Sequence, residues 1–311
     1  MYFLMTNDLE HLDISSGAMS QKVGNQIVSH ALPRLLKLYS KYEIKSTFFV
    51  LGSFARKFPE VIELISREGH EIACHGYSHD VSHGFDLMNL DEQIHHLKVS
   101  KKLLQKLSGQ EIISFRSPAL RINKDTVKAL EKTGFVIDSS VCPKRLDFFL
   151  SYGSKNKWRW LDCPENPYFM SKNDPFTIGD SNIFEIPVSG LIFGFIGSTM
   201  RSSPTIFRAL AKKIMHRSNK SGSPPVFLFH PNELLAYEPK PLYNRSNNIL
   251  SHMTKDFLRN SIKGKNLGDS CYNLLEEMII SFKQAGFNFT TVRKYYESNR
   301  KNIIQKRIKI E

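Results

Sequence analysis

The sequence predicts an α/β fold of the parallel (β/α) barrel type, and three observations favour this class. Short apolar runs that suit buried strands alternate along the chain with longer segments of helical periodicity. The 311 residues suit one barrel domain, and a hydrophobic content of 41% is enough for a full core. Polar residues follow the strand candidates repeatedly, as expected if parallel strands end together on one functional face.

The first half of the chain is expected to contain repeated β-α-β units. The segment 24–41 carries apolar residues at helical spacing, and the apolar runs on either side of it suit strands. Asp91 stands in a capping position at the start of a long amphipathic helix, and Gly109 ends that helix. The expected elements are strands at 2–6, 46–51, 71–74, 112–115 and 135–137 and helices at 24–41, 59–68, 91–107 and 124–133.

The second half begins with an irregular segment. Residues 142–182 are rich in Trp, Pro, Tyr, Asn and Lys with weak periodicity, and we interpret them as a loop inserted near the active face. The whole chain, residues 1–311, is expected to form one domain. The elements expected after the insertion are strands at 183–187, 226–229 and 287–290, helices at 204–215 and 269–285, a flexible turn at 218–225 and a basic helical tail at 292–311.

The chain is strongly basic, with 43 Lys and Arg residues against 30 Asp and Glu residues and a net charge of +13. This balance favours anionic partners such as phosphates or an acidic membrane surface. The helix at 204–215, continued by His216, Arg217 and Lys220, could dock on an anionic leaflet, with a solvated basic face as the alternative. Nucleic acid is not expected as a partner, because no recognised binding motif accompanies the charge.

The cysteines and the N-terminus bear on the expected location. The four cysteines form no C-x-x-C pair and no dense framework, so neither a disulfide scaffold nor a cysteine zinc site is expected. The short apolar run at the N-terminus is not preceded by basic residues, so no signal peptide is expected. These features predict a cytoplasmic protein, with peripheral contact at the inner membrane face as a further option.

His75 and His79 are the most distinctive pair in the sequence. They lie four positions apart where an apolar strand ends, and neutral imidazoles so placed can share one zinc or similar divalent ion. Such a pair needs carboxylate partners, and the ends of other strands supply them, because these ends converge on one face of a parallel barrel. The polar residues at strand ends are Asp8, Glu10, His75, His79, Arg116, Asp138 and His230.

These residues lie in motifs that resemble those of a known family. H-G-Y-S-H at 75–79, F-R-S-P at 115–118, D-S-S at 138–140 and L-F-H-P at 228–231 follow the order of the polysaccharide deacetylases of the NodB-homology type, also called carbohydrate esterase family four. The resemblance extends from about Tyr2 to Thr291. It implies a distorted (β/α) barrel, a divalent metal with zinc as the candidate, and hydrolysis of an N-acetyl or related acyl group from a sugar.

The first motif departs from the usual T-F-D-D of this family. Here Thr6 is followed by Asn7, Asp8, Leu9 and Glu10, and leucine cannot bind a metal. We therefore assign Asp8 as the catalytic base and Glu10 as the metal ligand, as in members with a D-x-E version. In the alternative register Asn7 takes the position of the base and Asp8 binds the metal, which would leave a weaker or inactive enzyme.

The resemblance also implies roles for the other motif residues. His75 and His79 complete the metal site with Glu10, and Arg116 pairs with the base. His230 is implied as the general acid, with Asp138 as its orienting partner. A backbone N–H near Ala119, next to Pro118, is expected to bind the oxyanion.

The substrate pocket is less well specified. Val141 stands where the family often carries tryptophan, and Trp158, Trp160 or Tyr168 of the insertion could replace it or could anchor the inserted loop. In the cytoplasm the expected substrate is an acylated sugar intermediate of a surface glycan, either nucleotide-linked or lipid-linked. The alternatives are a deformylase or another hydrolase of non-peptide C–N bonds, and a catalytically inactive carbohydrate-binding relative.

Overall fold

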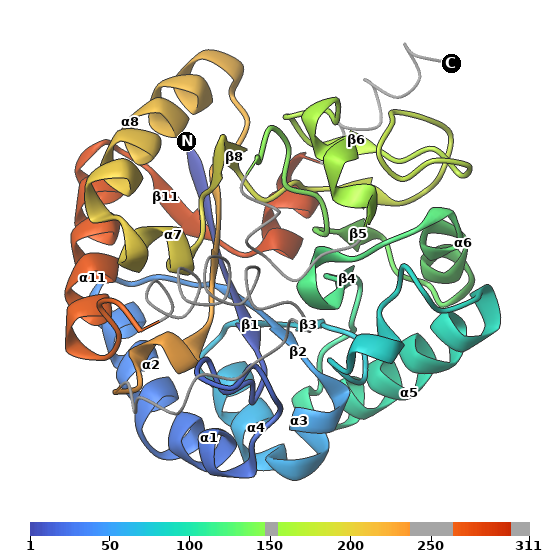
Figure 1. The fold of residues 1–311 in the computed structure, drawn as a ribbon, viewed down its shortest axis with the longest axis horizontal. Coiled ribbons are helices and arrows are strands. Elements are labelled where there is room, and N and C mark those ends of the chain that lie inside the picture. The colour runs from blue at the N-terminus through green and yellow to red at the C-terminus, as the bar shows by residue number, and fades with distance from the viewer. Residues whose placement is uncertain (147–154, 237–263, 300–311) are drawn as a thin grey trace, which may run out of the picture.

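In the computed structural model, residues 1–146, 155–236 and 264–299 are described, and they form a curved sheet surrounded by helices (Figure 1). Within these residues, the nine strands of the sheet follow the order β10-β1-β2-β3-β4-β5-β7-β6, with β11 also paired to β1. All pairings in this sheet are parallel except that of β6 with β7. The strands are β1 (Tyr2–Leu9), β2 (Thr47–Val50), β3 (Glu71–Cys74), β4 (Ser114–Phe115), β5 (Ile137–Asp138), β6 (Tyr168–Phe169), β7 (Phe184–Glu185), β10 (Val226–Phe229) and β11 (Asn288–Thr290), and a separate pair consists of β8 (Gly190–Leu191) and β9 (Phe193–Gly194).

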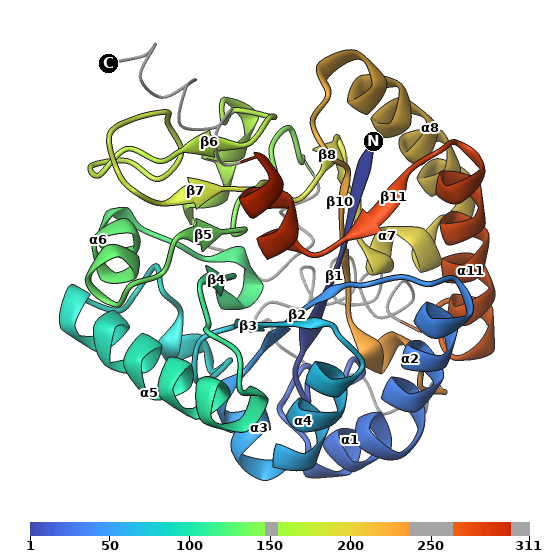
Figure 2. The same ribbon diagram turned by 180° about the vertical axis from the view of Figure 1, so that it is seen from behind.

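The sheet curls far enough for its two sides to meet. Ser189, which follows β7, donates its N–H to the carbonyl of Val226 at 3.0 Å, and Val226 donates its N–H to the hydroxyl of Ser189 at 3.0 Å. Seen from both sides, the helices form an outer ring around the strands (Figures 1 and 2). This arrangement is a distorted (β/α) barrel and confirms the predicted fold class.

The central strand β1 is longer than predicted, because it continues past Thr6 to Leu9. Polar residues are tolerated inside it since they have buried partners: Asn7 accepts a hydrogen bond from the hydroxyl of Tyr39, and Asp8 accepts one from Arg116. The predicted strands at 112–115 and 135–137 are reduced to the two-residue strands β4 and β5. The parallel strands still end at the same edge of the sheet, which is what places their following residues together.

The helices cover the outside of the barrel with their apolar faces. The helix predicted at 24–41 begins earlier, after the capping residue Ser20, and contains a π-helical turn, η1, directly before Leu32. The long helix α5 is capped by Asn89, whose side chain accepts the N–H groups of Asp91 and Glu92, so the prediction of Asp91 as the cap is wrong. The helices are α1 (Gln21–Gln26), η1 (Ile27–Ala31), α2 (Leu32–Lys41), α3 (Gly52–Lys57), α4 (Pro59–Arg67), α5 (Leu90–Ser108), α6 (Lys124–Lys132), α7 (Gly197–Ser202), α8 (Pro204–Ser221) and α11 (Asp269–Gln284), with a further helix at 292–299.

Helix α8 corrects another prediction. It continues to Ser221 and ends at Gly222 in the left-handed conformation, so the first half of the predicted flexible turn at 218–225 is helical. None of the helices in the described parts of the chain is long and apolar enough to cross a membrane. The predicted tail at 292–311 is described only as far as 299, where it is helical.

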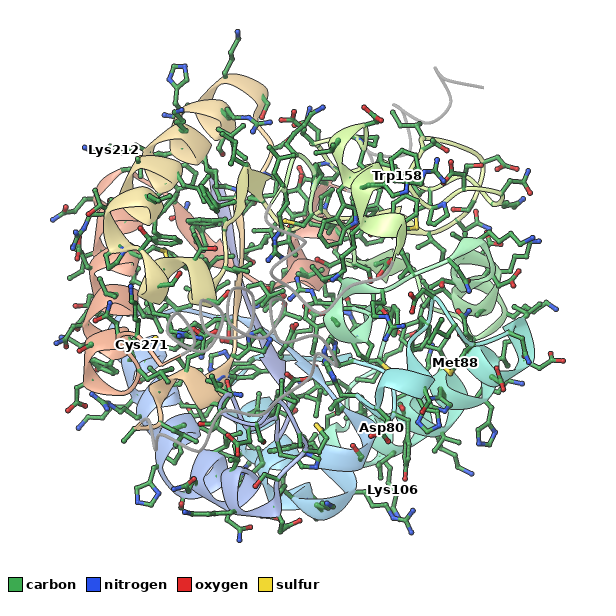
Figure 3. The ribbon with its side chains drawn as sticks, viewed as in Figure 1. Asp80, Met88, Lys106, Trp158, Lys212 and Cys271 are labelled. Atoms are coloured by element: carbon green, nitrogen blue, oxygen red, sulfur yellow. The ribbon has the colours of Figure 1, made fainter. Side chains whose placement is uncertain are left out.

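The predicted insertion at 142–182 contains the short helix η5 (Lys155–Leu161) and strand β6, and its residues 147–154 lie outside the described part. Trp160 is fully buried, and Tyr168 is buried with its hydroxyl donating to the carbonyl of Pro175 at 2.8 Å. Both residues therefore anchor the inserted segment and do not line a sugar pocket. Trp158 is 57% exposed, but it lies well away from Asp80, the neighbour of His79 (Figure 3).

Candidate functional site

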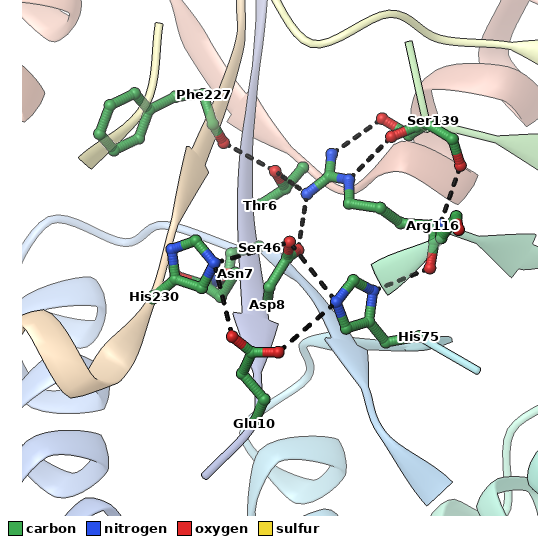
Figure 4. A network of polar contacts seen from close by, with 12 residues as sticks. Thr6, Asn7, Asp8, Glu10, Ser46, His75, Arg116, Ser139, Phe227 and His230 are labelled. Carbon is green, nitrogen blue, oxygen red and sulfur yellow. Dashed lines mark hydrogen bonds and ion pairs between the residues drawn. The ribbon is translucent and has the colours of Figure 1, made fainter. Parts of the chain in front are cut away.

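The carboxyl ends of the parallel strands bring acidic, basic and imidazole side chains together in one buried cluster (Figure 4). Alternation along β1 places Thr6, Asp8 and Glu10 on one face, because successive side chains of a strand point to opposite sides. His75 follows β3 and His230 follows β10, the latter on the other side of β1 from β2. The predicted convergence of these strand ends is therefore present in the structure.

Asn7 points away from this cluster. Its amide nitrogen donates to the hydroxyl of Ser46 at 3.3 Å, and its amide oxygen accepts from Tyr39 at 2.7 Å. Both contacts lie on the opposite face of β1 from Asp8. The geometry therefore favours the register in which Asp8 and Glu10 are the functional acids, and gives no support to Asn7 in the position of the base.

Glu10, His75 and His79 form a group that could hold a metal ion. One potential ligand atom from each lies within 4.8 Å of the others. The Oε2 atom of Glu10 lies 3.4 Å from Nε2 of His79 and 3.9 Å from Nε2 of His75, and this oxygen is buried without a hydrogen-bond partner. An unpartnered buried carboxylate oxygen facing two imidazole nitrogens fits a divalent cation, whose charge would compensate it.

A hydrogen bond to the Nδ1 side of the ring holds His75 in an orientation that suits metal binding. Its Nδ1 lies 2.8 Å from the carbonyl oxygen of Arg116, so Nδ1–H donates there and Nε2 keeps its lone pair facing Glu10. Burial lowers the pKa of His75, although the charges of Asp8 and Glu10 act in the opposite direction. The neutral imidazole favoured by burial is the form that binds a metal.

Arg116 is fully buried and forms the centre of the polar network. Its Nη1 donates to Oδ1 of Asp8 at 2.9 Å and to the hydroxyl of Thr6 at 2.8 Å, while Nε and Nη2 donate to the carbonyl and hydroxyl oxygens of Ser139 at 2.9 and 2.8 Å. Burial raises the pKa of Asp8, but the charges of Arg116, His75 and His230 outweigh it and hold the pKa below its ordinary value. Asp8 is therefore a carboxylate with one oxygen fixed by arginine.

Thr6 and Ser139 are functional residues that the sequence reasoning did not single out. The hydroxyl of Thr6 donates to the carbonyl of Phe227 at 2.7 Å and accepts from Arg116, and the hydroxyl of Ser139 donates to the carbonyl of Ile186 at 2.7 Å and accepts from the same guanidinium. Each hydroxyl thus fixes Arg116 to a neighbouring strand. Their positions in the first motif and in D-S-S were the available signals.

His230 is oriented by Glu233 and not by Asp138, which corrects the prediction. Nδ1 of His230 lies 3.3 Å from Oε1 of Glu233, and its Nε2 lies 4.0 Å from Oδ2 of Asp8 and 3.9 Å from Oε1 of Glu10. Burial lowers the pKa of His230, but the hydrogen bond with Glu233 and the charges of Glu10 and Asp8 outweigh it and raise the pKa to about 9. Glu233 lies on the turn η6 (Pro231–Leu234), three positions after the histidine.

Asp138 has a different place in the structure. It accepts the N–H of Ser139 at 2.8 Å and the hydroxyl of Ser140, which in turn accepts the N–H of Ser117 at 2.9 Å. Burial raises the pKa of Asp138 to about 7, although its hydrogen bonds with Ser140, Ser139 and Glu185 act in the opposite direction. Burial and the charge of Asp138 raise the pKa of Glu185 above its ordinary range. Asp138 therefore supports the loops that carry Arg116 and Ser139.

The predicted substrate residues Pro118 and Ala119 lie beside His79. Together with His79 and Asp80 they line a hollow of about 40 Å³. Ala119 adopts a left-handed conformation with φ of 53° within the turn η3 (Pro118–Leu120). The turn after β4 therefore forms one wall next to the group of potential metal ligands, as expected for a substrate-binding position.

Comparison with known proteins supports the resemblance inferred from the motifs. Residues 23–137 match the family model described as polysaccharide deacetylase. This part of the chain is similar to the polysaccharide deacetylase family. The matched range contains His75, His79 and Arg116, and the fold joins to it Asp8 and Glu10 before the range and His230 after it. The resemblance inferred from the motifs is confirmed.

Similar proteins come from fungi and bacteria. The chain is 35% identical over 133 residues to the peptidoglycan deacetylase-like protein of Gibberella zeae, covering 42% of this chain and 36% of that protein. It is 33% identical over 129 residues to the peptidoglycan deacetylase of Helicobacter pylori, covering 42% and 41%, so it spans about two fifths of these relatives. The solved structure of a probable polysaccharide deacetylase from Pseudomonas aeruginosa shares the fold, with a TM-score of 0.58 at 16% identity over 96% of this chain and 91% of that one.

Proposed function

We propose that the protein is a metal-dependent hydrolase that removes an N-acetyl or related small acyl group from an amino sugar. The observation that carries this proposal is the arrangement of Glu10, His75 and His79 beside an arginine-bound carboxylate, Asp8, and a third histidine, His230. Ligand, base and acid candidates thus occupy one buried cluster. This is the set of groups that hydrolysis of an amide requires.

The buried oxygen of Glu10 and the two facing imidazoles fit a divalent ion, with zinc as the candidate. When bound there, such an ion supplies Lewis-acid polarisation of the substrate carbonyl and lowers the pKa of a water molecule. The chain's own residues perform the proton transfers.

Asp8 acts as the general base in this proposal. Arg116 fixes Oδ1 of Asp8, so that Oδ2 faces His75 and His230 and is free to take the proton of the attacking water. His230 is the acid, because its Nδ1 is turned to Glu233 and its Nε2 faces the same space as Asp8. It would donate a proton to the leaving amine, and the backbone N–H near Ala119 would bind the developing oxyanion.

The size of the hollow beside His79 bears on the acyl group. Its volume of about 40 Å³ is small, since roughly 10–15 Å³ of such space already holds one water molecule. This space suits acetyl or formyl better than a long acyl chain. The deformylase alternative therefore stays beside the deacetylase, and a product assay separates the two.

The names of the similar proteins and the net charge of the chain suggest which molecule carries the acylated sugar. The names of the similar proteins specify peptidoglycan, which supports an N-acetylated amino sugar in a polymer. The net charge of +13 also suits a nucleotide-linked or lipid-linked sugar with its diphosphate. Either substrate is consistent with a location where surface glycans or their precursors are made.

The experiment is a product assay combined with metal analysis. Protein reconstituted with Zn²⁺ should release acetate from N-acetylated substrates, tested on peptidoglycan, chitin oligosaccharides and UDP-N-acetylglucosamine, with formylated analogues tested for formate. Metal binding that requires His75 and His79, together with acetate release, supports the proposal. A protein that takes up no divalent metal would contradict the mechanism, and metal uptake without turnover on any acylated sugar would favour the inactive carbohydrate-binding alternative.

A further inference from the structure

Arg201 is a buried arginine near the proposed acid, His230, and has no part in the motifs or in the proton transfers described above. It lies on α7, which packs against β10 and α11 (Figure 1). Strand β10 leads directly to His230, and only 5% of Arg201 is exposed. A guanidinium buried to this extent needs a compensating negative charge, and Glu233 supplies one.

The carboxylate of Glu233 lies between Arg201 and His230. Its Oε2 atom lies 3.3 Å from Nε of Arg201, and its Oε1 atom lies 3.3 Å from Nδ1 of His230. Glu233 is itself only 2% exposed. Because each oxygen of this carboxylate faces a different basic side chain, a displacement of the guanidinium would also displace the oxygen that orients the imidazole.

Arg201 is held in turn by the segment that precedes α11. Its Nη1 donates to the carbonyl of Lys265 at 3.2 Å, and its own carbonyl accepts from the side-chain amide of Asn266 at 2.7 Å. The N–H of Gly268 in the same segment donates to the carbonyl of Glu233 at 3.0 Å. The guanidinium and the carboxylate are therefore fixed relative to each other by a shared backbone support.

The proposed base has a comparable arrangement. Nη1 of Arg116 donates to Oδ1 of Asp8, and Oδ2 of Asp8 faces the imidazoles. In both pairs a buried arginine occupies one oxygen of a carboxylate and leaves the other oxygen turned to the proton-transfer groups. Since arginine keeps its charge throughout, Glu233 retains a cationic partner after His230 has given its proton to the leaving amine.

We propose that Arg201 is a positioning residue of the reaction, which through Glu233 holds the ring of His230 with Nε2 turned to the substrate. This inference rests on the proposed function. Other residues line the hollow beside His79, so replacing Arg201 should affect protonation of the leaving amine and not substrate binding. A misplacement of about 1 Å at a reacting group can cost roughly 10²-fold in rate, and a general acid contributes roughly 10²–10⁴-fold.

The test compares two substrates of the Zn²⁺-reconstituted full chain. An N-acetylated sugar needs a proton on its leaving amine, whereas nitrophenyl acetate loses a stable phenolate without one. Arg201→Met should lower kcat for the sugar by roughly 10–100-fold with little change in KM, and should leave hydrolysis of the nitrophenyl ester within about twofold. Arg201→Lys, which keeps the charge, should recover part of the rate.

The matched control is Arg208→Met. Arg208 lies on α8 and pairs with Glu277 at 2.7 Å on the surface, so this variant also removes an arginine from an ion pair and should leave both rates unchanged. An unchanged sugar rate in Arg201→Met, or an equal loss of both rates, would overturn the positioning role. Circular dichroism establishes that each variant is folded, and Arg201→Gln repeats the test if Arg201→Met is not.

A measurement without turnover separates this inference from the proposed function. In the metal-free protein, an Nδ1 proton bonded to Glu233 gives a slowly exchanging downfield signal in nuclear magnetic resonance, assigned by its absence in His230→Asn. The signal should shift or disappear in Arg201→Met and remain in Arg208→Met. A wild-type protein that hydrolyses neither substrate contradicts the proposed function, and the signal then decides the role of Arg201 alone. A signal that is unchanged in Arg201→Met, or missing from wild type, overturns the inference.

Discussion

Nη1 of Arg116 lies 2.9 Å from Oδ1 of Asp8, while Oδ2 of the same carboxylate lies 3.8 Å from Nε2 of His75 and 4.0 Å from Nε2 of His230. One oxygen is therefore held by a fully buried guanidinium and the other faces the space between two imidazoles. The two charges also compensate each other inside the barrel. Arg116 thus matters both for the stability of the fold and for the position of the base.

Replacing Arg116 by Met should destabilise the protein by about 3–5 kcal/mol, because it leaves the buried Asp8 without its compensating charge. The measurement is the free energy of unfolding in urea at neutral pH. The double variant Asp8→Asn/Arg116→Met should recover part of this loss, since it contains no uncompensated carboxylate. A cost below about 1 kcal/mol for Arg116→Met would contradict the pairing.

Asp8→Asn should retain bound metal and lose turnover, by a factor on the order of 10²–10⁴, because the amide keeps the shape of the side chain but cannot take a proton. Glu10→Ala should instead lose the metal. Elemental analysis of both variants beside their rates of acyl release checks the two assignments. The reverse pattern, with metal lost in Asp8→Asn and kept in Glu10→Ala, would restore the shifted register.

Glu233→Gln should lower the pKa of His230 from about 9, because the hydrogen bond to Glu233 is the largest influence that raises it. The histidine would then lose its proton at a lower pH. Nuclear magnetic resonance titration of the metal-free protein measures this directly, and in the active enzyme the alkaline limit of the rate profile should move in the same direction. An unchanged titration would show that Glu233 only packs against the ring.

Gly197 provides an independent check on Glu233. A Cβ atom at this position would lie 2.5 Å from Oε2 of Glu233, so the carboxylate occupies the space that a larger residue would need. Gly197→Ala should therefore displace Glu233 and shift the titration of His230 in the same direction as Glu233→Gln. A shift in the opposite direction would contradict the assigned role.

Asp138 should make stability depend on pH. Its pKa is raised to about 7 in the folded protein from 3.8, so the folded state holds a proton that the unfolded state releases between these values. The contribution of Asp138 to the free energy of unfolding is therefore complete below about pH 4, and it is lost as the pH rises towards 7. The buried His70, whose pKa burial lowers to about 4, acts in the opposite direction over part of this range.

The effect of Asp138 is therefore measured as the difference in the free energy of unfolding between wild-type protein and Asp138→Asn. The free energy of unfolding of wild type relative to the variant should fall by on the order of a few kcal/mol between pH 4 and pH 8, because asparagine does not titrate. Urea unfolding at a series of pH values measures it. A pH-independent difference would show that Asp138 is ionised in the folded state.

The sequence predicted the residues whose positions depend on where strands end. Asp8, Glu10, His75, Arg116 and His230 each lie at or directly after a parallel strand, and the topology of the barrel brings such positions together whatever their exact boundaries. This is why errors of several residues in the strand bounds did not disturb the prediction of the cluster. The family pattern contributed the proposed division of roles.

The sequence did not predict the contacts that depend on turn geometry and on side-chain packing. Glu233 reaches His230 only because the chain makes a tight turn after Pro231, and strand order gives no sign of this. Trp160 and Tyr168 resembled sugar-stacking residues in composition, but the inserted segment buries them as its own anchors. Burial of an aromatic ring in an irregular segment has no periodic pattern from which it could be inferred.

The position of β1 also has a consequence for how the chain acquires its structure. Thr6 donates to the carbonyl of Phe227, a residue 221 positions later, and the start of the strand pairs with β11. The backbone of β1 is therefore fully paired only when β10 and β11, more than 200 positions later, are in place. Folding should accordingly be slow, with a transition limited by the closing of a very long loop.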